Sequence, residues 1–170
     1  PKLIEISYLN QELNKDIEQL KKDLLWIKKT NLLKNNATLE EFKEIFPDES
    51  ALLGLVAQVK WGDKFKCRKC GYNRYYEGSE RYSRQCRSCS YRESATAHTV
   101  FDSIKGDKIK LLYTLYFYYH NPQYSIRQFS IEIEMRYATI LDFIKKFKYL
   151  IADEKKKYNN WTSLIMGRTN

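Results

Sequence analysis

Four cysteines are the feature of this sequence that most constrains its fold. Cys67 and Cys70 are separated by two residues, as are Cys86 and Cys89, and fifteen residues lie between the two pairs. Pairs of this spacing are typical of structural zinc sites, in which two short knuckles meet at one tetrahedral ion. Two disulfides are the alternative, but a bridge within each pair would strain its two-residue loop. Because four thiolates leave no open coordination position, we predict one structural Zn²⁺ rather than a catalytic metal.

The residues between the two cysteine pairs favour a β-hairpin. The segments YNRYYEG and RYSRQ are short and rich in tyrosine, and Gly78 and Ser79 interrupt them. Strand-forming segments on either side of such an interruption are typical of a hairpin. Gly71, directly after the first pair, can adopt the positive φ that a knuckle often needs. We therefore predict a zinc ribbon over residues 62–103.

The N-terminal region carries an apolar stripe. Its members recur every three or four residues, at Ile6, Leu9, Leu13, Ile17, Leu20, Leu24 and Ile27. This spacing predicts a helix within residues 1–35. Two interpretations of the stripe stay open: a coiled coil with a second copy, which would make the protein a homodimer, or an amphipathic helix packed on its own domain.

Residues 36–61 are predicted as a helical lead-in to the ribbon. Thr38 and Glu41 have the spacing of a capping box, and Pro47 with Asp48 separates that helix from a second one that runs to Trp61. Beyond the ribbon, the segment IKLLYTLYFYYH is apolar on nearly all sides. Such a segment predicts a buried helix, whose tyrosines pack in a core rather than stack on bases.

Residues 104–152 are predicted to form a helix-turn-helix-like segment. The segments SIRQFSIEIEM and RYATILDFIKKFKYLI have apolar residues at helical spacing and follow each other almost without a gap. The second helix is expected from Tyr137 to Leu150. The turn lacks the glycine often found there, and a helical hairpin without a binding role is the alternative. Residues 153–170 are predicted as a basic tail.

The predicted fold class is therefore α+β and mainly helical, with a four-cysteine zinc ribbon inserted between an N-terminal helical segment and the helix-turn-helix-like segment. Charge is distributed unevenly over these parts. The formal net charge is +9, and residues 64–92 hold nine arginines and lysines against Glu77 and Glu80. A second basic cluster comprises Lys145, Lys146, Lys148, Lys155, Lys156 and Lys157. Segregated positive charge suits a polyanion such as DNA, and two solvated faces are the alternative interpretation.

The predicted DNA contacts come from the ribbon and from the outward side of the helical hairpin. The set is Arg68, Lys69, Arg74, Arg81, Arg84, Arg87, Arg92, Arg127, Arg136, Tyr137, Thr139, Lys145 and Lys146. The second helix of the hairpin is expected to contact base edges in a major groove, and the ribbon to contact the DNA backbone or the minor groove. His98 and His120 are single histidines, and we predict a structural or exposed position for both rather than a role as ligands.

The order of these parts resembles a known family. FPDES, Trp61, FKCRKCG, QCRSC, SATAHTVFDS and SIRQFSIEIEMRYATILDFIKKF, over about residues 38–150, are similar to the N-terminal DNA-binding region of insertion-sequence transposases of the ISXO-like, zinc-ribbon type. The sequence departs from that pattern at three positions: Arg68 replaces a proline, His98 a glycine and Asp102 a histidine. The zinc ligands are unchanged, so the departures bear on the connection between the ribbon and the helices.

The resemblance implies binding to the terminal repeats of a mobile element. In that family a downstream ribonuclease-H-like domain carries an acidic triad that holds two metal ions. Here 20 residues follow Leu150, too few for such a core, and no acidic residue follows Glu154. We therefore expect a chain that lacks the catalytic domain and is not an enzyme. No Ser/His/Asp set, phosphate-binding loop or carboxylate cluster favours another reaction or a small-molecule substrate.

These observations favour a zinc-dependent, duplex-DNA-binding protein, either a transcription regulator or element-end binder derived from a transposase, or the N-terminal part of a complete transposase. A zinc-ribbon adaptor that binds other proteins is the alternative. The sequence has no apolar segment of membrane-spanning length, and its start lacks the apolar core of a secretory signal. A cytoplasmic, nucleoid-associated location is expected.

Overall fold

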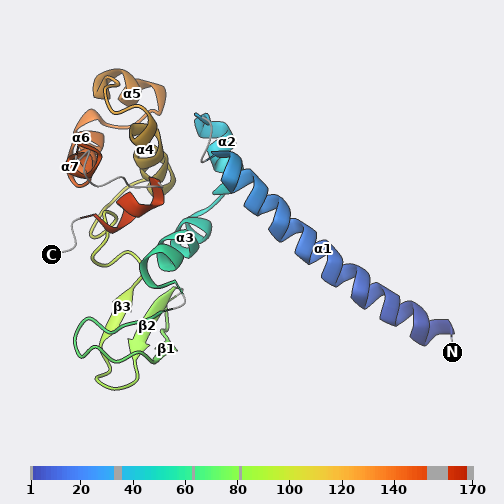
Figure 1. Cartoon of the computed structure of the whole chain (residues 1–170). Coiled ribbons are helices and arrows are strands. Elements are labelled where there is room, and N and C mark those ends of the chain that lie inside the picture. The colour runs from blue at the N-terminus through green and yellow to red at the C-terminus, as the bar shows by residue number, and fades with distance from the viewer. Residues whose placement is uncertain (1, 33–35, 63, 81, 153–160, 168–170) are drawn as a thin grey trace. The chain divides into compact units, whose positions relative to one another are not determined.

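The computed structural model describes residues 2–32, 36–62, 64–80, 82–152 and 161–167, and it divides the chain into two compact units, Pro1–Ala37 and Thr38–Asn170. The elements are α1 (Lys2–Leu32), α2 (Leu39–Ile45), α3 (Glu49–Trp61), β1 (Tyr75–Glu77), β2 (Ser83–Cys86), β3 (Arg92–Ser94), α4 (Lys108–His120), α5 (Ile126–Glu132), α6 (Tyr137–Lys145), α7 (Lys148–Ala152) and the 3₁₀ helix η1 (Trp161–Met166) (Figure 1). The predicted fold class, mainly helical with a small sheet at the cysteines, is confirmed. Among the described residues, no helix combines the length and apolarity that a membrane crossing requires.

The first unit is the single long helix α1. The described members of the apolar stripe are exposed, namely Ile6, Leu9, Leu13, Ile17, Leu20 and Leu24. The side chain of Ile27 lies outside the described residues. The predicted helix is confirmed, and its apolar face has no cover within the first unit.

The second unit begins with two capped helices. Thr38 caps α2 with both hydrogen bonds of the predicted capping box: its hydroxyl accepts from the Glu41 N–H, and the Glu41 carboxylate accepts from the Thr38 N–H. Asp48 caps α3, because its carboxylate accepts from the Ala51 N–H at 2.8 Å. These caps satisfy N–H groups that have no partner within a helix, and they fix where each helix starts.

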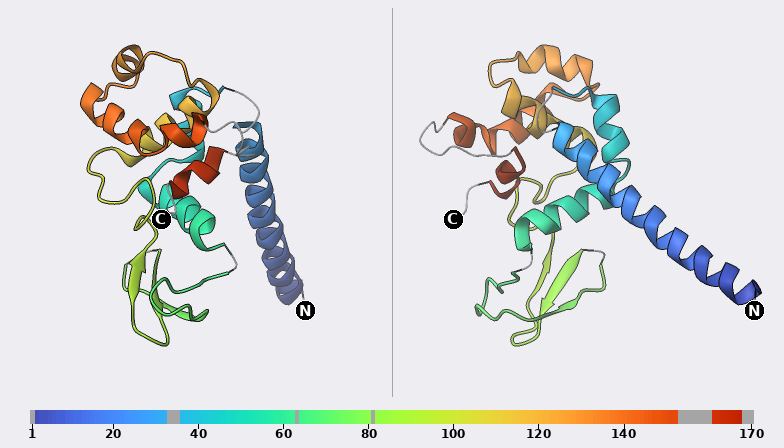
Figure 2. Two further views of the ribbon diagram at one scale, coloured as in Figure 1. Left: turned by 60° about the vertical axis from the view of Figure 1, so that its left-hand side comes forward. Right: turned by 45° about the vertical axis from the view of Figure 1, so that its right-hand side comes forward.

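The core of the second unit is built around α4, which buries most of its length as predicted. α2, α3 and η1 pack against it (Figure 2). Aromatic rings dominate this core: the ring centroid of Tyr116 lies 5.4 Å from that of Phe42 and 5.5 Å from that of Trp161. Burial raises the pKa of Tyr113 and Tyr118 to about 12. The α4 tyrosines therefore belong to the core rather than to a base-stacking surface.

Residues 161–167 were predicted as part of a basic tail, but they include a short helix with buried apolar side chains. Trp161, Leu164 and Ile165 of η1 are buried, and the Val100 N–H donates to the Ile165 carbonyl oxygen at 2.9 Å. Lys155, Lys156 and Lys157 lie outside the described residues.

α5 and α6 form the helical hairpin, and its turn closes without glycine. Glu134 adopts the left-handed conformation instead, with φ of 52°. The Met135 N–H then donates to the Ser130 carbonyl oxygen at 3.0 Å and the Glu134 N–H to that of Ile131 at 3.2 Å, which terminates α5. A non-glycine residue at such a position costs roughly 1–2 kcal/mol.

The second helix of the hairpin is shorter than predicted. α6 ends at Lys145 rather than continuing to Leu150, and α7 starts at Lys148. Between them, the Lys146 and Phe147 N–H groups donate to carbonyl oxygens only three residues back, those of Phe143 and Ile144. This tighter turn redirects the chain, and both Phe147 and Leu150 are buried.

Candidate metal centre and nucleic-acid interface

The ribbon is a three-stranded antiparallel sheet in the order β1-β2-β3. β1 and β2 form the predicted hairpin between the cysteine pairs, and β3 follows the second pair. Gly78 closes the hairpin, where its N–H donates to the Ser83 carbonyl oxygen at 2.9 Å. A Cβ atom at Gly78 would lie only 2.0 Å from the Ser83 hydroxyl oxygen, so the close approach of the two strands requires glycine here.

The two cysteine pairs form two knuckles with the same hydrogen bonds. In the first, the Cys67 N–H donates to the Tyr72 carbonyl oxygen and the Gly71 N–H to that of Cys67, both at 2.8 Å. In the second, Cys86 N–H donates to Tyr91 O at 2.9 Å and Ser90 N–H to Cys86 O at 3.1 Å. Gly71 and Ser90 occupy equivalent left-handed positions, with φ of 75° and 57°. The two knuckles are therefore copies of one turn, and the second forms it without glycine.

These knuckles bring the four sulfur atoms together. All four Sγ atoms lie within 4.8 Å of one another. The Cys67 and Cys89 sulfurs are 3.6 Å apart, and so are those of Cys70 and Cys86. Zinc–sulfur bonds of about 2.3 Å in a tetrahedron place sulfurs about 3.8 Å apart, so the cluster fits one Zn²⁺ held by all four thiolates.

The four thiols influence one another's ionisation. Burial opposes ionisation of Cys86, but the Cys89 and Ser88 N–H groups and the neighbouring thiols outweigh it and lower its pKa to about 7. The Tyr91 N–H favours the Cys89 thiolate, yet burial and the other three cysteines together raise the pKa of Cys89 to about 12. Each thiol thus affects the ionisation of its neighbours, and a bound zinc ion would allow all four to be deprotonated together.

A buried ion pair joins the ribbon to α3. Lys60 Nζ lies 2.8 Å from Glu93 Oε1, and the two side chains are only 4% and 2% exposed. The same ammonium group donates to the carbonyl oxygens of Ser94 at 2.9 Å and Ala97 at 2.7 Å. Burial lowers the pKa of Lys60, and the bond to Glu93 opposes that shift. Sequence reasoning missed this pair because Lys60 and Glu93 lie 33 residues apart and neither residue carries a local signal of the other.

The predicted contacts on the sheet divide between its two faces. Arg84 lies on the face toward α3, where its guanidinium carbon is 4.6 Å from the Trp61 ring centroid and 4.0 Å from that of Tyr75. On the other face, Arg92 pairs in register with Gln85, whose oxygen accepts from Arg92 Nε at 3.2 Å. Arg84 is thus stacked between aromatic rings, whereas Arg92 is exposed.

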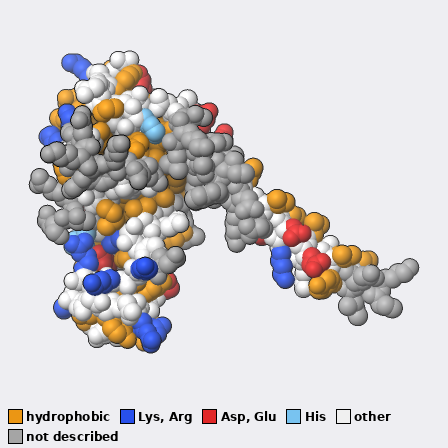
Figure 3. Space-filling view, in the orientation of Figure 1, with side chains coloured by type: hydrophobic (Ala, Val, Ile, Leu, Met, Phe, Trp, Pro, Cys, Tyr) orange, Lys and Arg blue, Asp and Glu red, His pale blue; other side chains and the backbone are white. Residues whose placement is uncertain are grey.

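Arg87 extends the exposed face. Its Nε donates to the Tyr75 carbonyl oxygen at 2.9 Å, and its guanidinium carbon lies 4.5 Å from the ring centroid of Tyr76, itself 56% exposed. We call Tyr76, Arg87 and Arg92 the outer face of the ribbon. Lys69 and Arg74 are also exposed, and Arg81 lies outside the described residues. A space-filling view shows Lys and Arg side chains gathered over the ribbon (Figure 3).

The predicted contacts on the hairpin are mostly exposed. Arg136 is the N-cap residue of α6, and Tyr137 in its first turn is 47% exposed. Thr139 is half-buried, and Arg127 of α5 is exposed. At the other end of α6, Lys145 pairs with Asp142 at 3.0 Å, and this pair is exposed and therefore weak.

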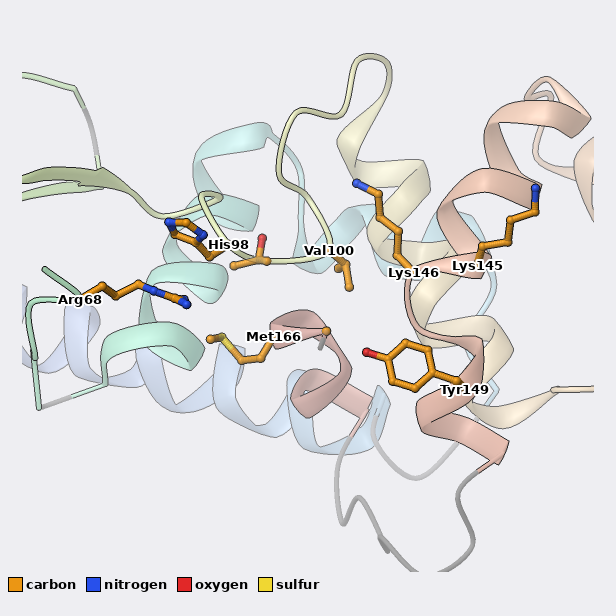
Figure 4. A pocket seen from close by; sticks show the side chains of 9 residues that line it. Arg68, His98, Val100, Lys145, Lys146, Tyr149 and Met166 are labelled. Carbon is orange, nitrogen blue, oxygen red and sulfur yellow. The ribbon is translucent and has the colours of Figure 1, made fainter. Parts of the chain in front are cut away.

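One pocket brings both parts of the predicted set together. It has a volume of about 600 Å³ and is lined by Arg68, His98, Thr99, Val100, Lys145, Lys146, Tyr149, Met166 and Gly167. Arg68 points into it from the first knuckle, and Lys145 and Lys146 line it at the end of α6, with the amino group of Lys145 directed away from Arg68 (Figure 4). No acidic side chain stands among the described residues that line it. We call it the basic pocket.

The connection from β3 to α4 forms the wall of the basic pocket. His98 adopts a left-handed φ of 60°, and its N–H donates to the Asp102 carboxylate at 2.9 Å. This hydrogen bond is the main cause that lowers the pKa of Asp102. Lys146 Nζ donates to the Asp102 carbonyl oxygen at 3.0 Å. Two of the three residues that depart from the resembled family, His98 and Asp102, therefore bond to each other. His120 lies away from this pocket, and burial lowers its pKa.

Comparison with known proteins identifies the ribbon. A family model described as the transposase zinc-ribbon domain, of the IS1595 type, matches residues 47–92. The match covers α3, both knuckles and the β1–β2 hairpin. No curated protein and no solved structure matches the chain. Residues 47–92 therefore carry a transposase-type zinc ribbon, whose four cysteines fit one structural zinc.

Proposed function

We propose that this chain is a DNA-binding protein that holds duplex DNA between its zinc ribbon and its helical hairpin and performs no chemistry on it. The basic pocket is the observation that carries the proposal. It collects Arg68 of the ribbon with Lys145 and Lys146 of α6, positions about 80 residues apart in the sequence. Three cations that line one pocket favour a phosphate group, and the exposed, weak Lys145–Asp142 pair can exchange its carboxylate for phosphate. Clustered cations account for most non-specific affinity for DNA.

In this proposal α6 contacts bases and the ribbon contacts phosphates. α6 has nine residues and a length of about 13 Å, enough to place its first turn in a major groove. Arg136, Tyr137 and Thr139 begin that helix and are at least partly exposed, so they are the candidates for base contacts. The outer face of the ribbon supplies Arg87 and Arg92 for the backbone. Arg84, stacked on Trp61 and Tyr75, supports the sheet instead.

We further propose the finer identity that the whole resemblance suggests: an ISXO-like, transposase-derived regulator or element-end binder, or the binding part of a complete transposase, in the cytoplasm at the nucleoid. The transposase-type ribbon over residues 47–92 supports this assignment. A protein-binding adaptor is the second candidate. Ile131 on α5 favours it, because its apolar side chain is 73% exposed. An exposed isoleucine side chain suits contact with a protein rather than with a phosphate backbone.

Fluorescence anisotropy with labelled duplexes at graded salt tests the proposal. The zinc-loaded chain should bind duplex DNA with an affinity that falls steeply as salt rises. Arg87→Ala and Arg92→Ala should weaken binding to every duplex and reduce the salt slope by about one counterion for each lost phosphate contact. Thr139→Ala and Arg136→Ala should cost about 1–3 kcal/mol on a selected sequence and little on random DNA.

Lys43→Ala is the matched control, because Lys43 is exposed on α2 and lines neither the basic pocket nor the outer face. It should change affinity no more than any single surface charge does. Absence of salt-dependent DNA binding by the folded, zinc-loaded chain would reject the proposal and favour the adaptor. Equal effects of both variant groups on selected and random DNA would reject the division of roles.

A further inference from the structure

The exposed face of α1 has the pattern of a coiled-coil seam. Three leucines on this face are largely exposed to solvent: Leu13 by 58%, Leu20 by 66% and Leu24 by 57%. A heptad register along α1 places Asn10, Ile17 and Leu24 at the a positions and Ile6, Leu13 and Leu20 at the d positions. In the sequence, Leu3 and Ile27 continue the repeat at either end. A strict seven-residue repeat favours left-handed supercoiling with another helix of the same period.

We propose that α1 pairs with α1 of a second copy of this chain, as a parallel, in-register, two-stranded coiled coil. The apolar residues alone do not select this arrangement, because isoleucine and leucine occur at both a and d. Two polar features of α1 select it.

The first feature is Asn10, the polar residue at an a position. In a parallel pair, a positions face each other, so the two Asn10 amides can hydrogen-bond across the seam. In an antiparallel pair, a faces d, and each amide would be buried against an apolar side chain without a partner. A single asparagine of this kind therefore favours two parallel strands in one register, at some cost in affinity.

The second feature is charge beside the seam. Asp16 occupies a g position and Lys21 the following e position, and both are exposed. In a parallel pair, the g position of one chain lies beside the e position of the next heptad in the other chain. Asp16 therefore meets Lys21 of the second chain, in two symmetric contacts. An antiparallel pair would set g against g and e against e, placing like charges together. The sequence repeats the same pattern one heptad later, at Asp23 and Lys28.

Lys21 is available for this contact. Within its own helix, Lys21 Nζ lies 3.0 Å from Glu18 Oε1, but the two side chains are 67% and 64% exposed. Exposed pairs of this kind contribute little, so exchange of Glu18 for Asp16 of the second chain costs little. A second copy thus offers α1 a matching apolar seam, a matching amide and opposite charges.

Sedimentation equilibrium of the full, zinc-loaded chain without DNA tests this pairing, so its outcome does not depend on the proposed DNA binding. We expect a reversible dimer of twice the 20.4 kDa chain mass. Leu13→Glu with Leu20→Glu should give a monomer, whereas Glu12→Gln, outside the seam, should leave the dimer unchanged. A monomer at all micromolar concentrations, a trimer, or a dimer that survives Leu13→Glu with Leu20→Glu would overturn the proposal.

Charge reversal tests the orientation. Asp16→Lys alone and Lys21→Glu alone should each weaken dimerisation by about tenfold, and the two changes in one chain should restore it. An antiparallel pair predicts no such loss and no rescue. Asn10→Leu should tighten association and yield species larger than a dimer. If single reversals left the dissociation constant unchanged, or if Asn10→Leu neither tightened association nor altered its stoichiometry, the parallel arrangement would be wrong.

Discussion

Residues 64–94 and the α4–α6 region lie in the same unit, yet they differ in what lies inside them. The ribbon buries few large side chains, chiefly Phe65, and its centre is the four-sulfur cluster. The helical region instead buries a continuous apolar core that includes Leu111, Leu115, Phe129 and Ile140. One part depends on a metal for its shape, because a sheet of ten residues cannot bury enough apolar area by itself. The other depends on packing.

This difference separates two kinds of sensitivity. Removing zinc should unfold the ribbon and leave the helical core intact, whereas removing a core side chain should lower the stability of the helices and leave zinc bound. The Lys60–Glu93 pair ties the ribbon to α3, which packs on α4, so its loss should affect both parts.

The largest expected effect is loss of one zinc ligand. Cys86→Ser removes a thiolate, and structural zinc contributes on the order of 10–16 kcal/mol to the folding of small zinc domains. We expect zinc content to fall from one ion per chain to near zero by metal analysis, with far-ultraviolet helicity largely kept. Ser88→Ala, within the same knuckle, is the control and should retain zinc. Full zinc occupancy in Cys86→Ser would contradict a four-thiolate site.

The second effect concerns the joint between the two parts. Lys60→Met leaves the buried Glu93 carboxylate without its cation, which should cost about 3–5 kcal/mol in chemical denaturation. Adding Glu93→Leu to Lys60→Met should recover part of that loss, because no buried carboxylate is then left unpaired, although the Ser94 and Ala97 carbonyl oxygens still lack the Lys60 donor. Lys64→Met at an exposed position is the control. A loss below about 1 kcal/mol for Lys60→Met would mean that the pair does not join ribbon and helix.

The third effect is confined to the helical core. Leu115→Ala should lower the free energy of unfolding by about 2–5 kcal/mol, because Leu115 is completely buried and its loss opens a cavity. Zinc content and affinity, followed with a chromogenic chelator, should stay at the level of the unmodified protein. Ile131→Ala, at an exposed position, should change stability by less than about 0.5 kcal/mol. Weaker zinc binding in Leu115→Ala would show that the two parts are not independent.

The smallest effect is a gain in stability at the hairpin turn. Glu134→Gly relieves the left-handed strain of a non-glycine residue, and the gain should be about 0.5–1 kcal/mol after the greater freedom of glycine in the unfolded chain is counted. Glu132→Gly, at the last residue of α5, should instead destabilise by about 1 kcal/mol, because it frees a helical residue and removes the carboxylate that accepts from Tyr124. Thermal unfolding of both variants decides this, and a destabilised Glu134→Gly would refute the strained turn.

The sequence predicted most of what depends on local chemistry. The spacing of Cys67, Cys70, Cys86 and Cys89 identified the metal cluster because ligand geometry tolerates few spacings. Caps at Thr38 and Asp48 were predictable because a side chain satisfies N–H groups only two or three residues away. The buried α4 was predictable from its lack of a polar face.

The rest depends on contacts between distant residues, which carry no local signal. Nothing near Lys60 in the sequence indicates Glu93, and nothing near Arg84 indicates that Trp61 and Tyr75 flank it. The end of α6 at Lys145 follows from burial of Phe147, which periodicity alone placed on a continuous helix. The basic pocket arises because Arg68 and Lys146 meet only after folding.

Hydrogen exchange followed by mass spectrometry, with and without a zinc chelator, tests the central contrast most directly. On chelation, amides of β1, β2 and both knuckles should lose protection, while those of α4, α5 and α6 should keep it, because only the ribbon depends on metal. Unchanged protection in the ribbon, or an equal loss of protection in α4, would contradict a ribbon held by zinc beside a helical core held by packing.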